Sequence, residues 1–164
     1  MKVLITGANG QLGQEFQKLF EKEKIEYIPT DYRELDITEI NEIRELVKKN
    51  EFSHIINCAA YNEVDRAEKD WKKAYLVNGI GVRNLAVVAN ETGVEIVHYS
   101  TDYVFDGKKG RVYTIYDEPN PINKYGESKH LGEKNIVLAD KYYLLRVSWV
   151  FGKGNINFAK KVIG

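Results

Sequence analysis

Hydrophobic residues fall into two kinds of segment along the chain, short apolar runs and longer stretches with helical spacing. The first run, KVLIT, is rich in β-forming residues and ends in glycines, which predicts a buried parallel strand. Similar runs predict four more strands, so strands are expected at 2–6, 25–30, 54–60, 94–100 and 142–151. Between them, apolar residues recur three or four positions apart, as on the buried face of a helix. These stretches predict helices at 11–23, 40–47, 69–91 and 125–138.

The alternation of strands with helices predicts the fold class. Parallel strands joined by helical crossovers form an α/β protein with helices on both faces of one doubly wound sheet. Thr38 is expected to cap the second helix, and Gly93 to end the third. Residues 101–122 lack periodicity and contain Pro119 and Pro121. A loop of this length in a compact domain is more often functional than not.

Composition narrows the range of functions. A chain of 164 residues, 43% of them hydrophobic, suits one domain with one substantial core. Its 24 basic and 24 acidic residues cancel, so nothing indicates the basic surface of a nucleic-acid binder. Cys58 is the single cysteine, and His54, His98 and His130 lack metal-ligand spacing, so we expect no disulfide and no metal. Without a signal peptide or an apolar segment long enough to span a bilayer, we expect a soluble cytoplasmic protein with no membrane partner.

The glycine-rich string GANGQLG follows the first predicted strand and opens the first helix. Gly7 permits a tight turn, Gly10 lets the backbone approach a pyrophosphate, and Gly13 allows the helix to pack close to the sheet. A helix N-terminus there offers amides and positive dipole to phosphates. At the start of an α/β pattern, this triplet favours dinucleotide binding and a Rossmann-type fold over an ordinary turn. The predicted cofactor residues in this turn are Gly7, Asn9, Gly10, Gln11, Leu12 and Gly13.

Two charged residues after the second strand bear on the cofactor. Asp31, eighteen residues beyond Gly13, is placed to accept hydrogen bonds from the adenosine ribose, which favours NAD(H). Arg33 is placed to neutralise a 2′-phosphate, which favours NADP(H). Both cofactors therefore stay open. Asp36 and Ile37, just beyond, are included in the predicted cofactor site.

The string YGESK places Tyr125 and Lys129 four residues apart on one face of a predicted helix. A phenol has a pKa of about 10, and a neighbouring ammonium favours its ionised form, so the lysine is expected to lower the pKa of the tyrosine. The same ammonium is suited to hold a nicotinamide ribose. Thr101 or Ser100, at the end of the fourth strand, supplies a hydroxyl that polarises a substrate carbonyl.

Taken together, these motifs resemble a known family. GxxGxxG, Asn78 in YLVN, a serine or threonine after the fourth strand, and YxxxK are similar to the extended short-chain dehydrogenases/reductases. Within that superfamily the chain resembles the dTDP-4-dehydrorhamnose reductase family. STDYVFDG and the NCAAY strand carry more of this resemblance than YxxxK does, and the strings that carry it lie at 57–68, 100–107, 119–129 and 144–152.

The resemblance implies a reaction and roles for particular residues. The reaction is reduction of the 4-keto group of a dTDP-activated 6-deoxysugar by NADH or NADPH, in dTDP-L-rhamnose synthesis. Thr101, Tyr125 and Lys129 would be catalytic, with Tyr125 donating a proton to the sugar C4 oxygen as hydride arrives. Further cofactor contacts are implied for Ala59, Ala60, Tyr61 and Asn78. Substrate contacts are implied for Ser100, Asp102, Tyr103 and Trp149.

The chain departs from the family in two short places and in length. Asn62 stands where a threonine is common, and VYTIYDE at 112–118 replaces a segment with a proline and acidic residues. Family members continue into a smaller C-terminal substrate-binding region. We therefore expect residues 1–164 to be the NAD(P)-binding Rossmann domain, with a helix from about Asn157 and the start of the substrate-binding region at 152–164. The rest of that region is expected to be absent.

Alternatives to the reductase remain open. One is a noncatalytic dinucleotide-binding regulatory subunit resembling the beta subunit of methionine adenosyltransferase. Another is a nucleotide-sugar epimerase or dehydratase. The expected partner is a nucleotide-sugar substrate, and a homodimer is kept open.

Overall fold

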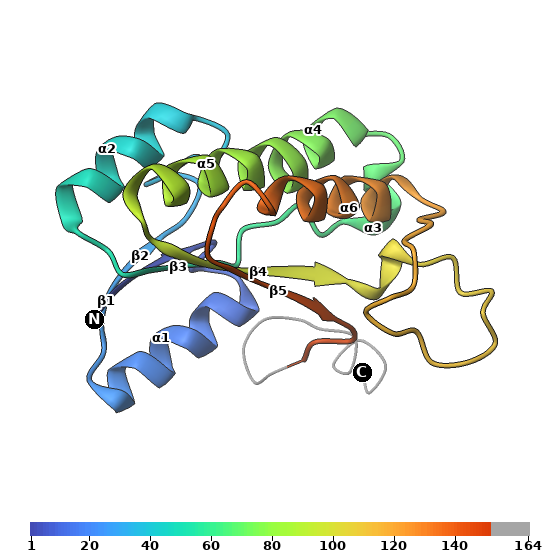
Figure 1. The fold of residues 1–164 in the computed structure, drawn as a ribbon, viewed down its shortest axis with the longest axis horizontal. Helices are drawn as coiled ribbons and strands as arrows, with labels where there is room; N and C mark the ends of the chain where they lie inside the picture. The colour runs from blue at the N-terminus through green and yellow to red at the C-terminus, as the bar shows by residue number, and fades with distance from the viewer. Residues whose placement is uncertain (152–164) are drawn as a thin grey trace.

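A five-stranded parallel sheet between two layers of helices makes up the fold (Figure 1). The computed structural model describes residues 1–151. The sheet order is β2-β1-β3-β4-β5, and all four pairings are parallel. The predicted α/β fold with a Rossmann-type sheet is confirmed. The strands are β1 Lys2–Thr6, β2 Glu26–Thr30, β3 His54–Asn57, β4 Glu95–Thr101 and β5 Tyr142–Val147.

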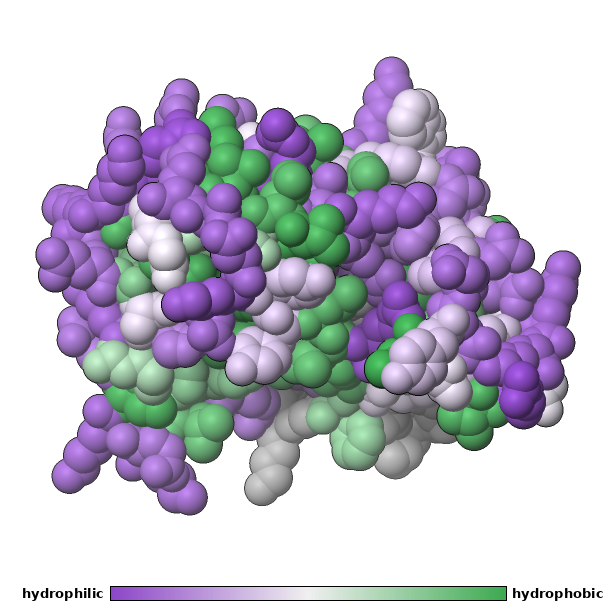
Figure 2. Space-filling view, in the orientation of Figure 1, coloured by the Kyte–Doolittle hydropathy of each residue, from purple (hydrophilic) through white to green (hydrophobic). Residues whose placement is uncertain are grey.

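Helices cover the two faces of the sheet unequally. One helix lies on one face and the others form the opposite layer (Figure 1). On the side of the molecule that Figure 2 shows, hydrophilic residues predominate with hydrophobic residues between them, as expected of amphipathic helices with one buried face. Helix α1, Gln11–Glu23, is the one helix of residues 1–151 on its face. The opposite layer contains α2 Ile40–Asn50, α3 Val64–Ala67, α4 Trp71–Tyr75, α5 Val82–Thr92 and α6 Lys124–Ile136.

Two apolar cores, one on each face, hold the layers together. Because side chains alternate along a strand, Leu4 enters the core beneath α2 and α5, whereas Val3 and Ile5 enter the core beneath α1. Ile55 and Ile56 of β3 divide between the two cores in the same way. Winding runs outward from β1 in both directions, so the crevice suited to a ligand lies at the carboxyl ends of β1 and β3.

The long helix expected over 69–91 is interrupted. Between α4 and α5 lies a π-helical turn, Leu76–Gly81, and α5 ends at Gly93 in the left-handed conformation. Two glycines of this turn allow close packing. A Cβ at Gly79 would lie 2.5 Å from Leu131 Cδ2, and one at Gly81 would lie 2.6 Å from Ile37 Cδ1. The apolar spacing indicated a helix but not its widened turn, which often marks a functional position.

Some predicted boundaries were wrong. Strand β3 ends at Asn57, because the backbone amide of Ala59 donates to the side-chain oxygen of Asn57 at 3.2 Å. Strand β5 ends at Val147, and Trp149 just beyond has a φ of 53°. Thr38 does not cap α2, because its amide and hydroxyl both donate to Asp36 Oδ1, and Glu39 is the N-cap.

Two further predictions concern the loop at 101–122 and the C-terminal residues 152–164. The unpatterned stretch 101–122 contains one 3₁₀ turn, Asp102–Val104. The helix expected from about Asn157 and the substrate-binding region expected at 152–164 lie outside the described residues. Within residues 1–151, no helix is both long and apolar enough to cross a membrane.

Gly132 tests how α6 packs on the π turn. A Cβ at Gly132 would overlap the carbonyl oxygen of Asn78, which is backbone and cannot rotate away. We expect Gly132→Ala to lower the free energy of unfolding by about 1–3 kcal/mol, as overpacked cores do. Gly79→Ala is the matched control, since its obstacle is the end of the flexible Leu131 side chain. Equal losses for both variants in urea denaturation would contradict this account of the packing.

Candidate functional site

A cavity of about 660 Å³ opens at the carboxyl ends of β1, β3 and β4. Its walls come from five places: the turn at the start of α1, the segment after β3, the end of β4, α6, and the end of β5 with the residues after it. This is the crevice where the winding of the sheet reverses, the usual ligand position in open parallel sheets. The wall residues predicted from the sequence are Gly10, Gln11, Leu12, Ala59, Ala60, Ser100, Thr101, Asp102, Tyr103, Tyr125, Lys129 and Trp149.

The glycine turn packs directly against the backbone of the segment that follows β3. Gly7 has a φ of 64°, and a Cβ there would lie 2.6 Å from the Ala59 backbone. A Cβ at Gly13 would lie 2.6 Å from the Gly7 oxygen. Gly10 is the N-cap of α1 and places no side chain over the first-turn amides. The turn therefore presents backbone amides and the positive end of a helix to the cavity.

A row of buried polar side chains lies beneath this cavity. Thr6, Asn57 and His98 are aligned on adjacent strands. Asn57 Oδ1 accepts from the Thr6 hydroxyl at 2.7 Å, and Asn57 Nδ2 lies 3.0 Å from His98 Nδ1. Burial holds the pKa of His98 well below its ordinary value. His98 is therefore a neutral member of the core.

Asp31 lies beside the glycine turn, past the end of β2. Its carboxylate accepts from the Asn9 amide at 3.1 Å and from the Tyr32 amide at 2.7 Å. A negative charge is thus fixed next to the predicted pyrophosphate turn. Arg33 is exposed two residues further on. Ile37 is buried against Gly81, so it contributes to the core of this region.

Asn78 braces the segment after β3. In the π turn its side-chain oxygen accepts from the Tyr61 amide at 2.8 Å, and its nitrogen donates to the Tyr61 carbonyl at 3.0 Å. Asn78 also donates to Ser128 Oγ at 2.9 Å, and Ser128 donates to the Tyr125 carbonyl at 2.7 Å. Asn78 was predicted to contact a cofactor. The structure instead places its side chain behind the cavity wall, where it joins that wall to α6.

Thr101, Tyr125 and Lys129 all face the same cavity. The Tyr125 ring packs edge-on against Tyr103, with centroids 5.6 Å apart. The Thr101 side chain lies near enough to the phenol to lower its pKa. Lys129 is 3% exposed, and its Nζ donates to the Tyr99 carbonyl at 2.6 Å. Residues from β4 and α6, far apart in sequence, therefore meet at one point.

The electrostatics of this group differ from the sequence-based expectation. Burial raises the pKa of Tyr125, and the nearby Thr101 side chain opposes that rise. Burial lowers the pKa of Lys129 to about 8. The expectation that the Lys129 ammonium lowers the pKa of Tyr125 was therefore wrong. The tyrosine stays a phenol, which is a proton donor, while the lysine loses its proton more readily than usual.

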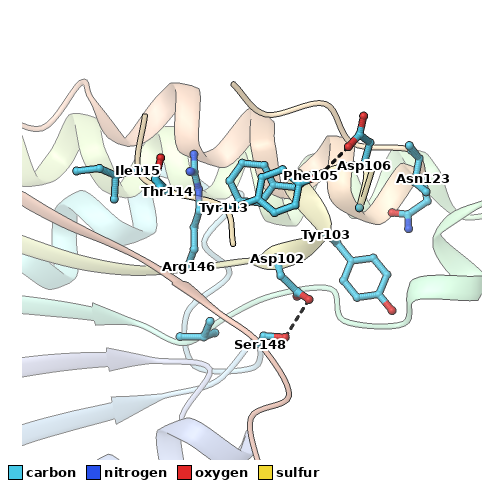
Figure 3. A pocket seen from close by; sticks show the side chains of 13 residues that line it. Asp102, Tyr103, Phe105, Asp106, Tyr113, Thr114, Ile115, Asn123, Arg146 and Ser148 are labelled. Atoms are coloured by element: carbon cyan, nitrogen blue, oxygen red, sulfur yellow. Dashed lines mark hydrogen bonds between the residues drawn. The ribbon is translucent and has the colours of Figure 1, made fainter. Parts of the chain in front are cut away.

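The predicted substrate residues surround this group. Asp102 Oδ1 accepts from the Thr101 hydroxyl at 3.1 Å, and Asp102 Oδ2 accepts from the Ser148 hydroxyl at 2.9 Å (Figure 3). Tyr103 and Trp149 are 41% and 65% exposed at the rim. Ser100 is almost fully buried. Of the two hydroxyls proposed from the sequence, that of Thr101 is the one that acts on the pKa of Tyr125.

A second cavity of about 580 Å³ adjoins the first (Figure 3). Phe105 stacks on Tyr113 with ring centroids 4.1 Å apart, and the Arg146 guanidinium lies over Phe105 at 5.0 Å. The sequence interpretation missed these residues. A signal was present, because Phe105 lies in STDYVFDG and Arg146 is a charged residue within an otherwise apolar strand. The two cavities share Asp102, Tyr103, Val147 and Ser148.

Two carboxylates hold the loop that contains VYTIYDE, the segment that differs from the family pattern. Asp106 accepts from the Tyr113 hydroxyl at 2.8 Å and from Asn120 at 3.1 Å. Asp117 accepts from the Thr114 hydroxyl at 2.9 Å and pairs with Lys109, whose hydrogen bond is the main cause that lowers the pKa of Asp117 to about 2. The loop thereby supplies Tyr113, Thr114 and Ile115 to the second cavity.

Comparison with known proteins identifies the family. The family model described as RmlD substrate binding domain matches residues 1–164. The chain belongs to this family. A dTDP-4-dehydrorhamnose reductase from Aggregatibacter actinomycetemcomitans is 42% identical over 164 residues, which are 99% of this chain and 56% of that protein. The resemblance inferred from the motifs is confirmed.

Solved structures of dTDP-4-dehydrorhamnose reductases have the same fold as this chain. The crystal structure of a dTDP-4-dehydrorhamnose reductase from Clostridium acetobutylicum has a TM-score of 0.95 and 46% identity, covering 99% of this chain and 58% of that one. The dTDP-4-dehydrorhamnose reductase from Bacillus anthracis in complex with NADP has a TM-score of 0.95 and 44% identity, with the same coverage. The chain thus spans little more than half the length of these relatives.

Asn78→Ala tests the brace behind the cavity. It leaves the Tyr61 amide and carbonyl without their side-chain partner, so we expect unfolding free energy to fall by about 2–4 kcal/mol, since buried unsatisfied polar groups are costly. Asn41→Ala, on the exposed surface of α2, is the control and should change stability by less than about 0.5 kcal/mol. A loss for Asn78→Ala no larger than that of the control in guanidinium denaturation would rule out the brace.

Proposed function

We propose that the chain is the cofactor-binding and catalytic part of a reductase that uses NADH or NADPH to reduce the 4-keto group of a dTDP-activated 6-deoxysugar, in dTDP-L-rhamnose synthesis. One observation carries the proposal: Thr101, Tyr125 and Lys129 share a cavity with the glycine turn. Family membership and the activity named for the relatives support the same reaction.

The residues present fit a dinucleotide. Only hydrogen fits at Gly7 and Gly13, so the turn lies tight against the sheet, and the first turn of α1 lines the cavity through Gln11 and Leu12. We assign the pyrophosphate to this turn, the adenosine ribose to Asp31, and the nicotinamide ribose to Lys129. Ala59 and Ala60 are small enough to let the dinucleotide pass over the end of β3. A bound reduced nicotinamide supplies the hydride for the reaction.

Tyr125 is assigned the proton transfer. Because its pKa is raised by burial, the phenol is protonated at neutral pH and able to donate to an oxygen that gains negative charge. The substrate oxygen would lie between the phenol and the Thr101 hydroxyl. Thr101 is the second hydroxyl at this point, and its one hydrogen, which now goes to Asp102 Oδ1, would turn to the substrate oxygen. Two hydroxyls directed at one developing oxyanion stabilise it more than either does alone.

Cofactor preference depends on the charges after β2. The relative from Bacillus anthracis was solved with NADP, which supports NADP(H). The Asp31 carboxylate repels a 2′-phosphate and accepts from a ribose hydroxyl, which supports NAD(H). Arg33, two residues further on, would neutralise a 2′-phosphate, which supports NADP(H). We therefore assign cofactor discrimination to the balance between Asp31 and Arg33.

Asp31→Asn tests this assignment. The amide keeps an acceptor for the Asn9 backbone but removes the charge. We expect NADH affinity to fall about tenfold, as for the loss of a charged hydrogen bond, while NADPH affinity is unchanged or higher. Fluorescence titration of the full chain with each cofactor gives the two dissociation constants. Glu15→Gln, exposed on α1, is the control, and equal losses for both cofactors in Asp31→Asn would reject the ribose assignment.

Tyr125→Phe tests the chemistry. It removes the proton donor and keeps the ring, so we expect turnover to fall at least about 100-fold with cofactor affinity nearly unchanged. The assay follows oxidation of NADPH or NADH, with a dTDP-4-keto-6-deoxysugar, by the longest natural chain that contains these residues. Tyr75→Phe, whose hydroxyl bonds Glu127 outside the cavity, is the control. Undiminished turnover in Tyr125→Phe would contradict the assignment, and cofactor binding without reduction of any 4-keto sugar would favour a noncatalytic binder.

A further inference from the structure

A buried carboxylate lies one helical turn after Lys129. Glu133 is 6% exposed on α6, and residues four apart lie on the same helix face. Two hydrogen bonds from Arg146 hold it, from Nε at 2.8 Å and from Nη2 at 2.9 Å. His130 Nδ1 lies 3.3 Å away. A buried charge needs such partners, because an unpaired one is costly.

Among residues 1–151, Glu133 is the one buried carboxylate, and it lies on the same face of α6 as Lys129. Titratable or charged groups from four parts of the chain surround Lys129. Cys58 follows β3, His98 and Tyr99 lie on β4, and Arg146 lies on β5. Tyr125 and Glu133 lie on α6 with Lys129 itself. Burial raises the pKa of Cys58 and of Tyr99 to about 12, so both are neutral at pH 7. His98 and Tyr125 are neutral as well. Among the described residues of this group, only Glu133 contributes negative charge.

We propose that Glu133 is a positioning residue for Lys129: its carboxylate, one helical turn away and held by Arg146, keeps the buried ammonium charged at the Tyr99 carbonyl beside the cavity. The same Arg146 lies over Phe105 in the wall of the second cavity. One carboxylate therefore connects the lysine of the first cavity with the wall of the second. The inference rests on the proposed function only for the role of Lys129 in turnover.

Two opposing causes set the pKa of Lys129. Burial lowers the pKa of Lys129 to about 8, and the Glu133 charge opposes that lowering. Removing the charge leaves burial unopposed, so the pKa of Lys129 falls further. The ammonium is then lost at a lower pH. Activity that needs the ammonium declines at a correspondingly lower pH.

The direct test is an NMR titration of the full chain carrying ¹³C-labelled lysine. The Lys129 resonance is assigned by its absence in Lys129→Met. We expect a midpoint near 8 in the wild type. In Glu133→Gln it should fall by on the order of one pH unit, as for loss of a nearby opposite charge. Glu127→Gln, on the same helix but paired with Tyr75 and Lys124, is the matched control and should leave the midpoint unchanged.

Glu133→Asp separates charge from packing. It keeps the carboxylate, so the midpoint should stay closer to that of the wild type than to that of Glu133→Gln. If Glu133→Gln fails to fold, Glu133→Asp decides: a midpoint lowered by about one pH unit despite the retained charge would overturn the proposal. An unchanged midpoint in folded Glu133→Gln would overturn it as well.

The second readout is the pH dependence of kcat/KM. In Glu133→Gln the alkaline limb should move to lower pH with the Lys129 midpoint, whereas a purely structural defect lowers activity equally at every pH. The NMR titration needs no turnover. If the chain reduces no 4-keto sugar, the proposed function fails while the titration still tests the link between Glu133 and Lys129.

Discussion

The close approach of the Gly7 turn to the Ala59 backbone is the constraint on which the rest of the site depends. Only hydrogen fits at Gly7 and Gly13, so α1 begins close against the sheet and its first amides face the crevice between β1 and β3. A side chain at either position would push the turn into the space that a pyrophosphate needs. The cavity exists because backbone, and not side chains, fills this corner.

The opposite wall depends on a different kind of contact. Asn78, at the centre of the π turn, uses both ends of its amide on the Tyr61 backbone and also reaches Ser128 on α6. This brace fixes α6 relative to the segment after β3. The position of α6 in turn brings Tyr125 to Thr101 and Lys129 to the Tyr99 carbonyl. A widened helical turn thus sets the relation between the two walls.

Burial determines the acid and base properties of the site. Tyr125 and Lys129 are both withdrawn from water, which disfavours the charged form of each. The phenol remains a proton donor, and the ammonium depends on a carboxylate one turn away. The pair therefore does not act by the direct ammonium-to-phenol effect expected from YxxxK. A bound ligand that touches both groups is what would couple them.

The sequence by itself determined the fold class, the glycine turn and the strings that identify the family, because these depend on periodicity and local spacing. Helical spacing and the end of the fourth strand predicted one site for Thr101, Tyr125 and Lys129, and the resemblance made them catalytic. The effect expected of Lys129 on the pKa of Tyr125 was wrong. The sequence interpretation missed the π turn, the brace formed by Asn78 and the stack of Arg146 on Phe105. Only the tertiary structure decided these features, since each depends on side chains brought together from distant segments and on the water that their packing excludes.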